Sequence, residues 1–185
     1  MYKRQDYVGA GFTNVGQIEV IGHDIFVNYT RDIGPGVMNI SLDYTNMDEY
    51  NTDSFTGSSQ TTNNVGFPGV PSTRNNLGIS YSWDIYSVAL TQRSIGDYKL
   101  SDEAEKDGAG NPTGGKVAVG DNQDEYSALD LQITADFGKY GVVTYGMLNA
   151  EDKDPLPDNV LNYETYLSLY SNQGLITYMK WNIAF

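Results

Sequence analysis

Apolar and polar residues alternate strictly along the last twelve residues of the chain. One set of alternate positions holds Leu175, Thr177, Met179, Trp181, Ile183 and Phe185, and the intervening set holds Gly174, Ile176, Tyr178, Lys180, Asn182 and Ala184. A period of two residues is typical of a β-strand whose two faces meet different environments. The pattern therefore predicts a strand over residues 174–185 that closes the chain on an aromatic residue.

Similar alternation recurs upstream, cleanly in some segments and less so in others. Every second position is apolar at Met38–Tyr44, Leu77–Trp83, Tyr86–Leu90 and Leu129–Phe137, and Ile21, Ile25, Val27 and Tyr29 share one face of an earlier segment. Residues 140–150 are apolar without a clear facing, and residues 6–13 are a further candidate. We therefore expect an all-β chain of about seven or eight antiparallel strands.

The connections between these segments alternate in length. Short turns are expected at 31–36, 84–85 and 138–139, and long connections at about 46–75, 97–124 and 151–173. Outer-membrane β-barrels have short turns on the periplasmic side and long loops outside the cell. With that assignment the strand that ends at Phe185 also ends on the periplasmic side, so the turn lengths and the C-terminus indicate the same topology.

Large aromatic residues gather near the expected short-turn end. They are Tyr29, Trp83, Tyr86, Phe137, Tyr140, Trp181 and Phe185. Aromatic rings favour the interface between membrane and water, where both their polar and apolar parts are satisfied. The alternative is that they are ordinary core aromatics of a soluble β domain; we favour the membrane girdle.

Composition narrows the class of protein. The net charge of −13 argues against a nucleic-acid partner, because phosphate binding needs clustered Lys and Arg. The chain has no cysteine, so it contains neither disulfides nor Cys-based metal sites. No apolar run approaches the roughly 20 residues of a membrane helix, whereas a membrane strand needs only about 9–11 residues. Met1–Gln5 carries positive charge, but no apolar signal segment follows it. Residues 1–5 are expected to be an artificial extension or disordered.

Candidate chemistry is sparse. Acidic residues are dense in two long connections, at 102–125 and 151–158, but their spacing does not match an EF-hand, so solvated loops are favoured over a Ca²⁺ site. Residues 107–115 are turn material without the ending of a phosphate-binding loop. The single histidine, His23, has no Ser or Cys motif to pair with it. We therefore expect no enzyme activity, no catalytic, metal or cofactor-binding residues and no cofactor, and the sequence does not identify the substrate-binding residues.

The C-terminal third contains a series of short motifs. They are Tyr126-Ser-Ala-Leu-Asp-Leu-Gln132, Phe137-Gly-Lys-Tyr-Gly141, Gly146-Met-Leu-Asn149, the segment 150–157 with Pro155 and Pro157, Leu167-Ser-Leu-Tyr170, and the strand from Gly174. Their order resembles the end of a TonB-dependent outer-membrane receptor. Upstream, Gly16-Gln-Ile-Glu-Val-Ile-Gly22 and Pro71-Ser-Thr-Arg74 are also similar to that family. The chain departs from it where Ala150-Glu151 replaces Leu-Phe, where Leu156 separates the two prolines, and where Leu175 replaces Arg.

The resemblance implies a location in the outer membrane of a Gram-negative bacterium. It also implies uptake of a scarce solute, such as a metal chelate (siderophore), vitamin or glycan. The expected partners are the outer-membrane lipid bilayer, the barrel-assembly machinery through the strand ending at Phe185, and TonB through an N-terminal plug that has no counterpart in these residues. Because such receptors have 22-stranded barrels, residues 6–185 are expected to be the C-terminal segment of a larger barrel.

Two alternatives stay open at the level of sequence. The first is a complete eight-stranded barrel with residues 6–13 as its first strand, which would act as an adhesin or a structural membrane protein. The second is a soluble β-sandwich that binds carbohydrate or Ca²⁺, because sandwiches show the same alternation. The sandwich requires Leu129, Leu131 and Ile133 to face a core.

Overall fold

The computed structural model describes residues 17–53, 61–67, 69–154, 171 and 173–183. Within this part the chain is all-β, apart from one 3₁₀ turn, η1, at Gly138–Tyr140. The strands are β1 (Ile18–Ile33), β2 (Gly36–Asp53), β3 (Thr61–Asn63), β4 (Thr73–Trp83), β5 (Tyr86–Ile95), β6 (Tyr98–Lys106), β7 (Pro112–Gln123), β8 (Tyr126–Asp136), β9 (Val142–Leu148) and β10 (Ile176–Asn182). The expected all-β class is confirmed.

Seven of these strands form one antiparallel sheet, in the order β1-β2-β4-β5-β8-β9-β10, and β3 adds to the end of β2. Each of the seven segments expected from alternation corresponds to one of these strands. The pairing of β9 with its neighbours shows which of its residues share a face, which the sequence alone left open. The C-terminal strand is shorter than expected, since β10 covers 176–182 rather than 174–185. The candidate strand at 6–13, the extension at 1–5 and the terminal Phe185 lie outside the described residues.

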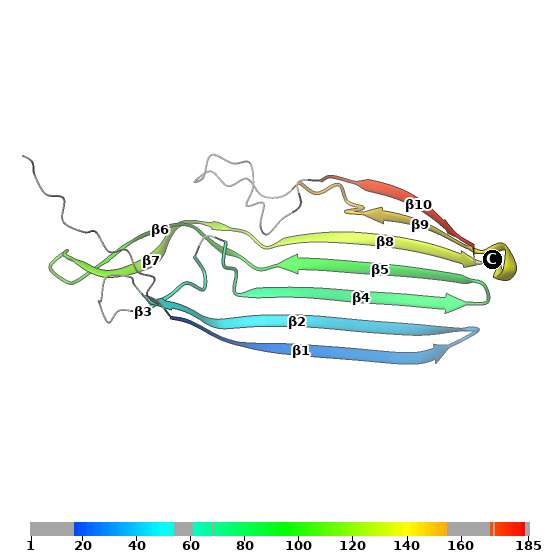
Figure 1. The fold of residues 1–185 in the computed structure, drawn as a ribbon, viewed down its shortest axis with the longest axis horizontal. Helices are drawn as coiled ribbons and strands as arrows, with labels where there is room; N and C mark the ends of the chain where they lie inside the picture. Colours follow the sequence, from blue (N-terminus) through cyan, green and yellow to red (C-terminus); the bar gives the residue numbers. More distant parts are fainter. Residues whose placement is uncertain (1–16, 54–60, 68, 155–170, 172, 184–185) are drawn as a thin grey trace, which may run out of the picture.

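The short turns all lie at one end of the sheet, and the long connections leave from the other (Figure 1). Gly34 takes a positive φ of 56° in the β1–β2 turn, Asp84 takes 49° in the β4–β5 turn, and Gly138 takes 60° between β8 and β9. These are residue types that tolerate the left-handed region. The predicted turn positions are therefore confirmed, and β10 ends at the same end as the short turns.

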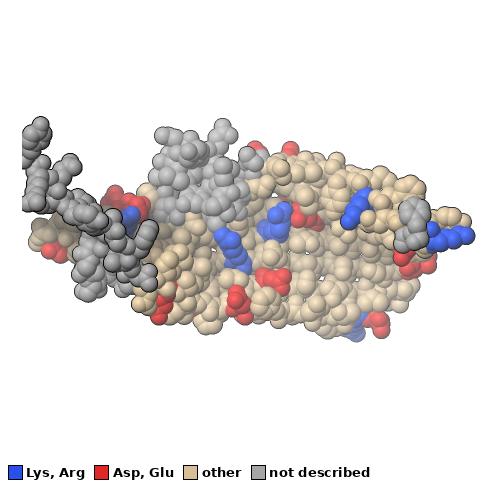
Figure 2. Space-filling view, in the orientation of Figure 1, with Lys and Arg blue, Asp and Glu red and all other residues tan. Residues whose placement is uncertain are grey.

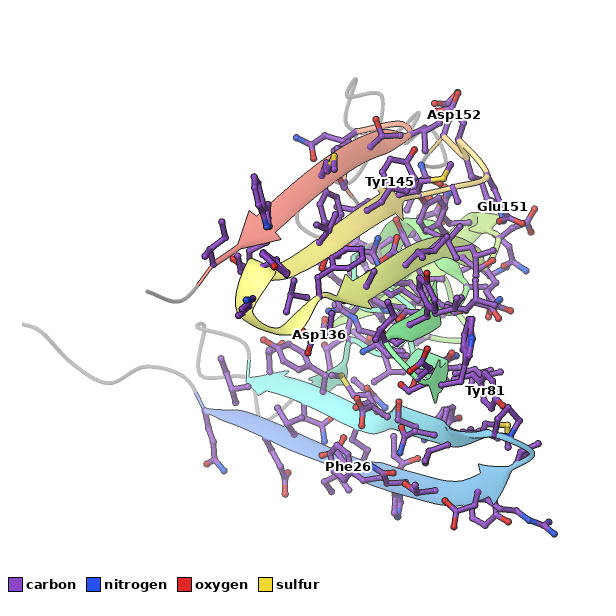
Figure 3. The ribbon with its side chains drawn as sticks, turned by 90° about the vertical axis from the view of Figure 1, so that its right-hand side faces the viewer. Phe26, Tyr81, Asp136, Tyr145, Glu151 and Asp152 are labelled. Carbon is purple, nitrogen blue, oxygen red and sulfur yellow. The ribbon has the colours of Figure 1, made fainter. Side chains whose placement is uncertain are left out.

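The sheet is open. Its order ends at β1 on one side and at β10 on the other, and these two strands lie on opposite sides of the molecule in both ribbon views (Figures 1 and 3). No closed barrel forms among the described residues. The two edge strands thus each leave one row of backbone N–H and C=O groups without a neighbouring strand in this part of the chain.

The connection at 97–124 is not a loop, which corrects the prediction from sequence. It forms the hairpin β6–β7, which continues the β5 and β8 strands beyond the sheet (Figure 1). The pairing Ile95↔Tyr126 is followed, after two residues on each strand, by Tyr98↔Gln123. The sequence lacks clean alternation here because the hairpin has no apolar face to place against a core. The connection at 46–75 is likewise partly ordered, since β2 runs to Asp53 and β3 pairs with it.

A small packed cluster joins the hairpin to the sheet. Tyr98, Tyr126 and Ala128 are buried, and Ile95 packs against them. The amide of Lys99 donates to the carbonyl of Gly66, which ties the base of the hairpin to the segment after β3. No side chain of the described residues is fully buried with a large volume, so the sheet itself has no conventional core.

Candidate functional site

One face of the sheet is mainly apolar along all seven strands. Cross-strand pairing places the alternate positions of each strand in common rows, and we call this face the belt. Its middle row is Tyr29, Ile40, Ile79, Leu90, Leu131, Met147 and Thr177, and the row nearer the short turns is Arg31, Met38, Tyr81, Val88, Ile133, Tyr145 and Met179; Arg31 and Thr177, on the two edge strands, are the polar members.

The belt is not covered by any other part of the described chain. Ile79 is 42% exposed, Ile133 is 43% exposed and Met179 is 74% exposed. In a β-sandwich these side chains would lie between two sheets, and Leu129, Leu131 and Ile133 would face a core. The described residues supply no second sheet over them, so the arrangement that the sandwich alternative requires is absent from this part of the structure.

The last row of the belt, beside the short turns, is rich in aromatic rings. Trp83 stands 5.4 Å from Tyr81 and 5.8 Å from Tyr86, measured between ring centroids. At the β10 edge of the sheet the indole N–H of Trp181 donates to the carbonyl of Tyr140 at 3.0 Å.

The register corrects the sequence assignment in one place. Tyr29 was expected near the short turns with the other rings, but it pairs with Ile40 and lies in the middle of the belt. Tyr81 lies one row further from the short turns than Trp83, because it pairs with Met38 and Val88; it stacks on Trp83 and donates from its hydroxyl to the carbonyl of Ile33 at 2.8 Å. Only the register between strands shows which rings share a level.

The opposite face of the sheet, which we call the polar face, carries small and polar side chains. The Asn39 amide nitrogen donates to Asn28 at 2.7 Å and to Thr30 at 2.8 Å, across the β1–β2 pair. Thr134 and Thr144 share a hydrogen bond of 3.2 Å, across β8 and β9. Such cross-strand pairs lie on one face because side chains two residues apart point the same way.

Figure 3 shows the strands of the sheet fanning apart from β1 to β10, with the side chains of Tyr81 and Phe26 on different strands of the fan. Phe26 is an exception to the polar face. It pairs with Asp43, alternates with Asp24 and Asn28, and is 75% exposed. The sequence could not separate it from its apolar neighbours Ile25 and Val27, because three apolar residues in a row carry no period.

The polar face holds an ordered corner at the end away from the short turns. The Arg93 guanidinium donates from Nε and Nη2 to the two carboxylate oxygens of Asp130, at 3.0 and 3.1 Å. Asp130 also accepts the backbone amide of Asn149 at 2.9 Å. Asn149 in turn bonds both the amide and the carbonyl of Lys153, and Tyr126 donates to that carbonyl at 3.2 Å.

A cavity of about 210 Å³ lies beside this corner. Its polar walls include Arg93, Tyr126 and Asn149, and its apolar walls include Ile95, Leu148 and Ile176. A mixture of apolar walls and a few placed polar groups is typical of small-molecule sites. This site leaves no signal in the sequence, because its residues come from β5, β8, β9 and β10 and from the segments that follow β9 and precede β10, and they meet only in the folded sheet.

The charged groups form no metal centre in the described part of the chain. No group of three or more His, Asp or Glu side chains lies close enough to hold an ion there. His23 contacts Asp48 at 2.6 Å between Nδ1 and a carboxylate oxygen, and both side chains are exposed. Among the described residues there is also no helix long and apolar enough to span a membrane.

Comparison with known proteins found no matching family model, no matching curated protein and no matching solved structure. The functional argument consequently depends on the two faces of the sheet and on the residues themselves.

Proposed function

We propose that this chain forms C-terminal strands of the β-barrel of a TonB-dependent outer-membrane receptor, which imports a scarce solute such as a metal chelate (siderophore), vitamin or glycan. The observation that supports the membrane role is the belt, a mainly apolar surface that crosses seven adjacent strands and that no other described residue covers. Contiguous exposed apolar surfaces of this extent are found where a protein meets a partner or a membrane.

A lipid bilayer fits the belt better than a protein partner does. The belt keeps the same level on every strand and is bounded on the short-turn side by the aromatic row, as lipid-facing surfaces of outer-membrane barrels are. From Leu77 to Trp83 it extends about 20 Å along β4, at roughly 3.4 Å per residue. The strands β4, β5 and β8 have 11, 10 and 11 residues, which matches the roughly 9–11 residues of a membrane strand.

The open edges support the interpretation as part of a larger barrel. Unpaired backbone N–H and C=O groups in lipid cost several kcal/mol each, so membrane barrels are closed. The described residues contribute seven strands along the sheet, an odd number, whereas bacterial single-chain barrels have an even number. In this proposal further strands pair with β1 and β10, the polar face lines the lumen, and a plug domain connects the barrel to TonB.

Refolding tests the membrane role. The chain, unfolded in urea and diluted into detergent micelles, is expected to regain β-structure by circular dichroism, and to aggregate in buffer alone. Because of its two edges, it is expected to run on gels as oligomers rather than as a compact monomer. A compact monomer that unfolds only on boiling would favour the small closed barrel instead, and a soluble monomer without detergent would rule out the membrane role.

The receptor role has a separate test. The coding sequence upstream of Met1 is expected to encode the remaining barrel strands and a plug domain before them. A gene that encodes barrel strands without a plug would contradict TonB-dependent uptake, while leaving the outer-membrane barrel intact.

A further inference from the structure

Two arginines stand side by side on the polar face, near the end of the sheet away from the short turns. Arg74 lies in β4 and Arg93 in β5. Arg74 pairs with Ile95, so Arg93 is its diagonal neighbour on the same face. Diagonal neighbours across two antiparallel strands are about 7–8 Å apart at their backbones, within reach of long side chains. Figure 2 shows blue and red groups beside one another on the middle strands of this face.

Arg93 is held in one orientation by its ion pair. Asp130 takes the donors on Nε and Nη2, and the carboxylate is itself fixed by the amide of Asn149. Asp130 is largely buried, with 18% of its side chain exposed, whereas half of the Arg93 side chain is exposed. The Nη1 donors of Arg93 bond to no other described residue. Since a guanidinium has five donors in a rigid plane, those that remain are directed before any ligand arrives.

Arg74 has no ion pair with any other described residue. Its diagonal neighbour on the other side is Asp43 in β2, but the two do not come within ion-pair distance. A guanidinium without a partner among the described residues is notable in a chain with 24 acidic and 11 basic residues. No described residue therefore occupies the donors of Arg74 or neutralises its charge, beside the pre-oriented Arg93.

The cavity beside Arg93 defines the kind of ligand that would fit. Its polar groups are the Arg93 guanidinium, the Tyr126 phenol, the Asn149 amide and the side chains of Ser171 and Gln173, and its apolar walls come from Ile95, Ala128, Leu148 and Ile176. Guanidinium groups form their strongest and most directional hydrogen bonds with the oxygens of carboxylates and phosphates. The geometry suits a solute with an anionic oxygen group over the arginines and a small apolar body in the cavity.

We propose that Arg74 and Arg93 form an anion subsite on the polar face, which binds a carboxylate or phosphate group of the transported solute. The subsite extends the proposed receptor function and rests on it in treating the polar face as the lumen. Asp130 acts as a positioning residue, because it orients Arg93 without touching the solute.

The test is a titration of the refolded chain in detergent micelles with inorganic phosphate, at constant ionic strength maintained with chloride. The side-chain Nε–H signals of ¹⁵N-labelled arginine report each guanidinium separately. Both Arg74 and Arg93 signals are expected to shift along one saturable curve. Arg74→Gln is expected to raise the dissociation constant about tenfold or more, as for loss of a charged hydrogen-bond partner. The matched control is Lys180→Gln, which removes a cation near the short turns. This variant is expected to change the dissociation constant for phosphate less than twofold.

Each result has a definite meaning. Shifts that rise linearly with phosphate, or that are equal in Arg74→Gln and Lys180→Gln, would overturn the subsite. Asp130→Asn is expected to weaken phosphate binding while the Arg74 signal still shifts. An unchanged affinity for phosphate in this variant would refute the positioning role of Asp130. If the chain refolds in micelles but does not bind phosphate, the anion subsite is refuted and the membrane role stands. If the chain binds phosphate saturably while it is soluble and monomeric without detergent, the membrane role is refuted instead.

Discussion

An arginine introduced into the belt should destabilise the chain to an extent set by its depth in the membrane. Leu90 lies in the middle row, four residues from Tyr86 in the aromatic row. Four residues span about 14 Å along the strand, or about 10 Å along the membrane normal at a tilt near 45°. The apolar band of an outer-membrane barrel is about 25 Å tall, so Leu90 is expected within a few ångströms of its centre.

The expected cost of Leu90→Arg is accordingly near the midplane value of about 2–4 kcal/mol, and that of Tyr86→Arg is about 0–1 kcal/mol. A cost of about 2–4 kcal/mol corresponds to roughly 1.5 to 3 orders of magnitude in the unfolding equilibrium. Thr91→Arg is the matched control, since its side chain lies on the polar face opposite Asp130. The assay is urea or guanidinium unfolding of the three variants and the unaltered chain in lipid vesicles, followed by tryptophan fluorescence.

Depth dependence separates lipid from a protein core. If the belt faced a core, Tyr86→Arg would be as damaging as Leu90→Arg, because both replace a large apolar side chain by a charge. Equal losses at the two belt positions, or a loss for Thr91→Arg that matches that for Leu90→Arg, would refute the assignment of this face to lipid.

Two further predictions concern local structure. Hydrogen bonds from the backbone and side chain of Asn111 lower the pKa of Asp107 below its ordinary value of 3.8. The ionised carboxylate therefore stabilises the β6–β7 turn fully above pH 3.8, and this stabilisation is lost as the pH falls through the lowered pKa. The protection factors of the turn's amides, measured by NMR hydrogen exchange between pH 5 and roughly pH 2 and corrected for the intrinsic exchange rate at each pH, are expected to fall at low pH only in the chain with Asp107. Identical profiles in the Asp107→Asn variant would contradict this. A Cβ at Gly146 would overlap the ring of Tyr178, so Gly146→Ala is expected to cost about 1–3 kcal/mol in the same unfolding assay. Gly108→Ala meets open space and is expected to change stability little, and similar losses in both variants would show that the ring does not pack on the glycine.

Much of the sheet was predictable from sequence because the relevant signals are local. Alternation at period two depends on neighbours within one strand, and short turns depend on residues such as Gly34 and Asp84 that tolerate positive φ. The hairpin at 97–124 was missed because neither of its faces is apolar, so its strands carry no alternation to detect. Its pairing depends instead on continuing the β5 and β8 strands, which is a relation between residues far apart in the chain.

The sequence by itself determined the seven strands of the main sheet, the face that most of their residues share and where the tight turns lie. The tertiary structure alone decided which rows those faces form, because the level of each residue depends on the register with its neighbouring strand. Register placed Tyr29 in the middle of the belt, beside Ile40, and placed Trp83 and Tyr86 opposite each other in the aromatic row. It also brought Arg93, Asp130 and Asn149 together, through hydrogen bonds that join three strands and leave no periodic trace in the sequence.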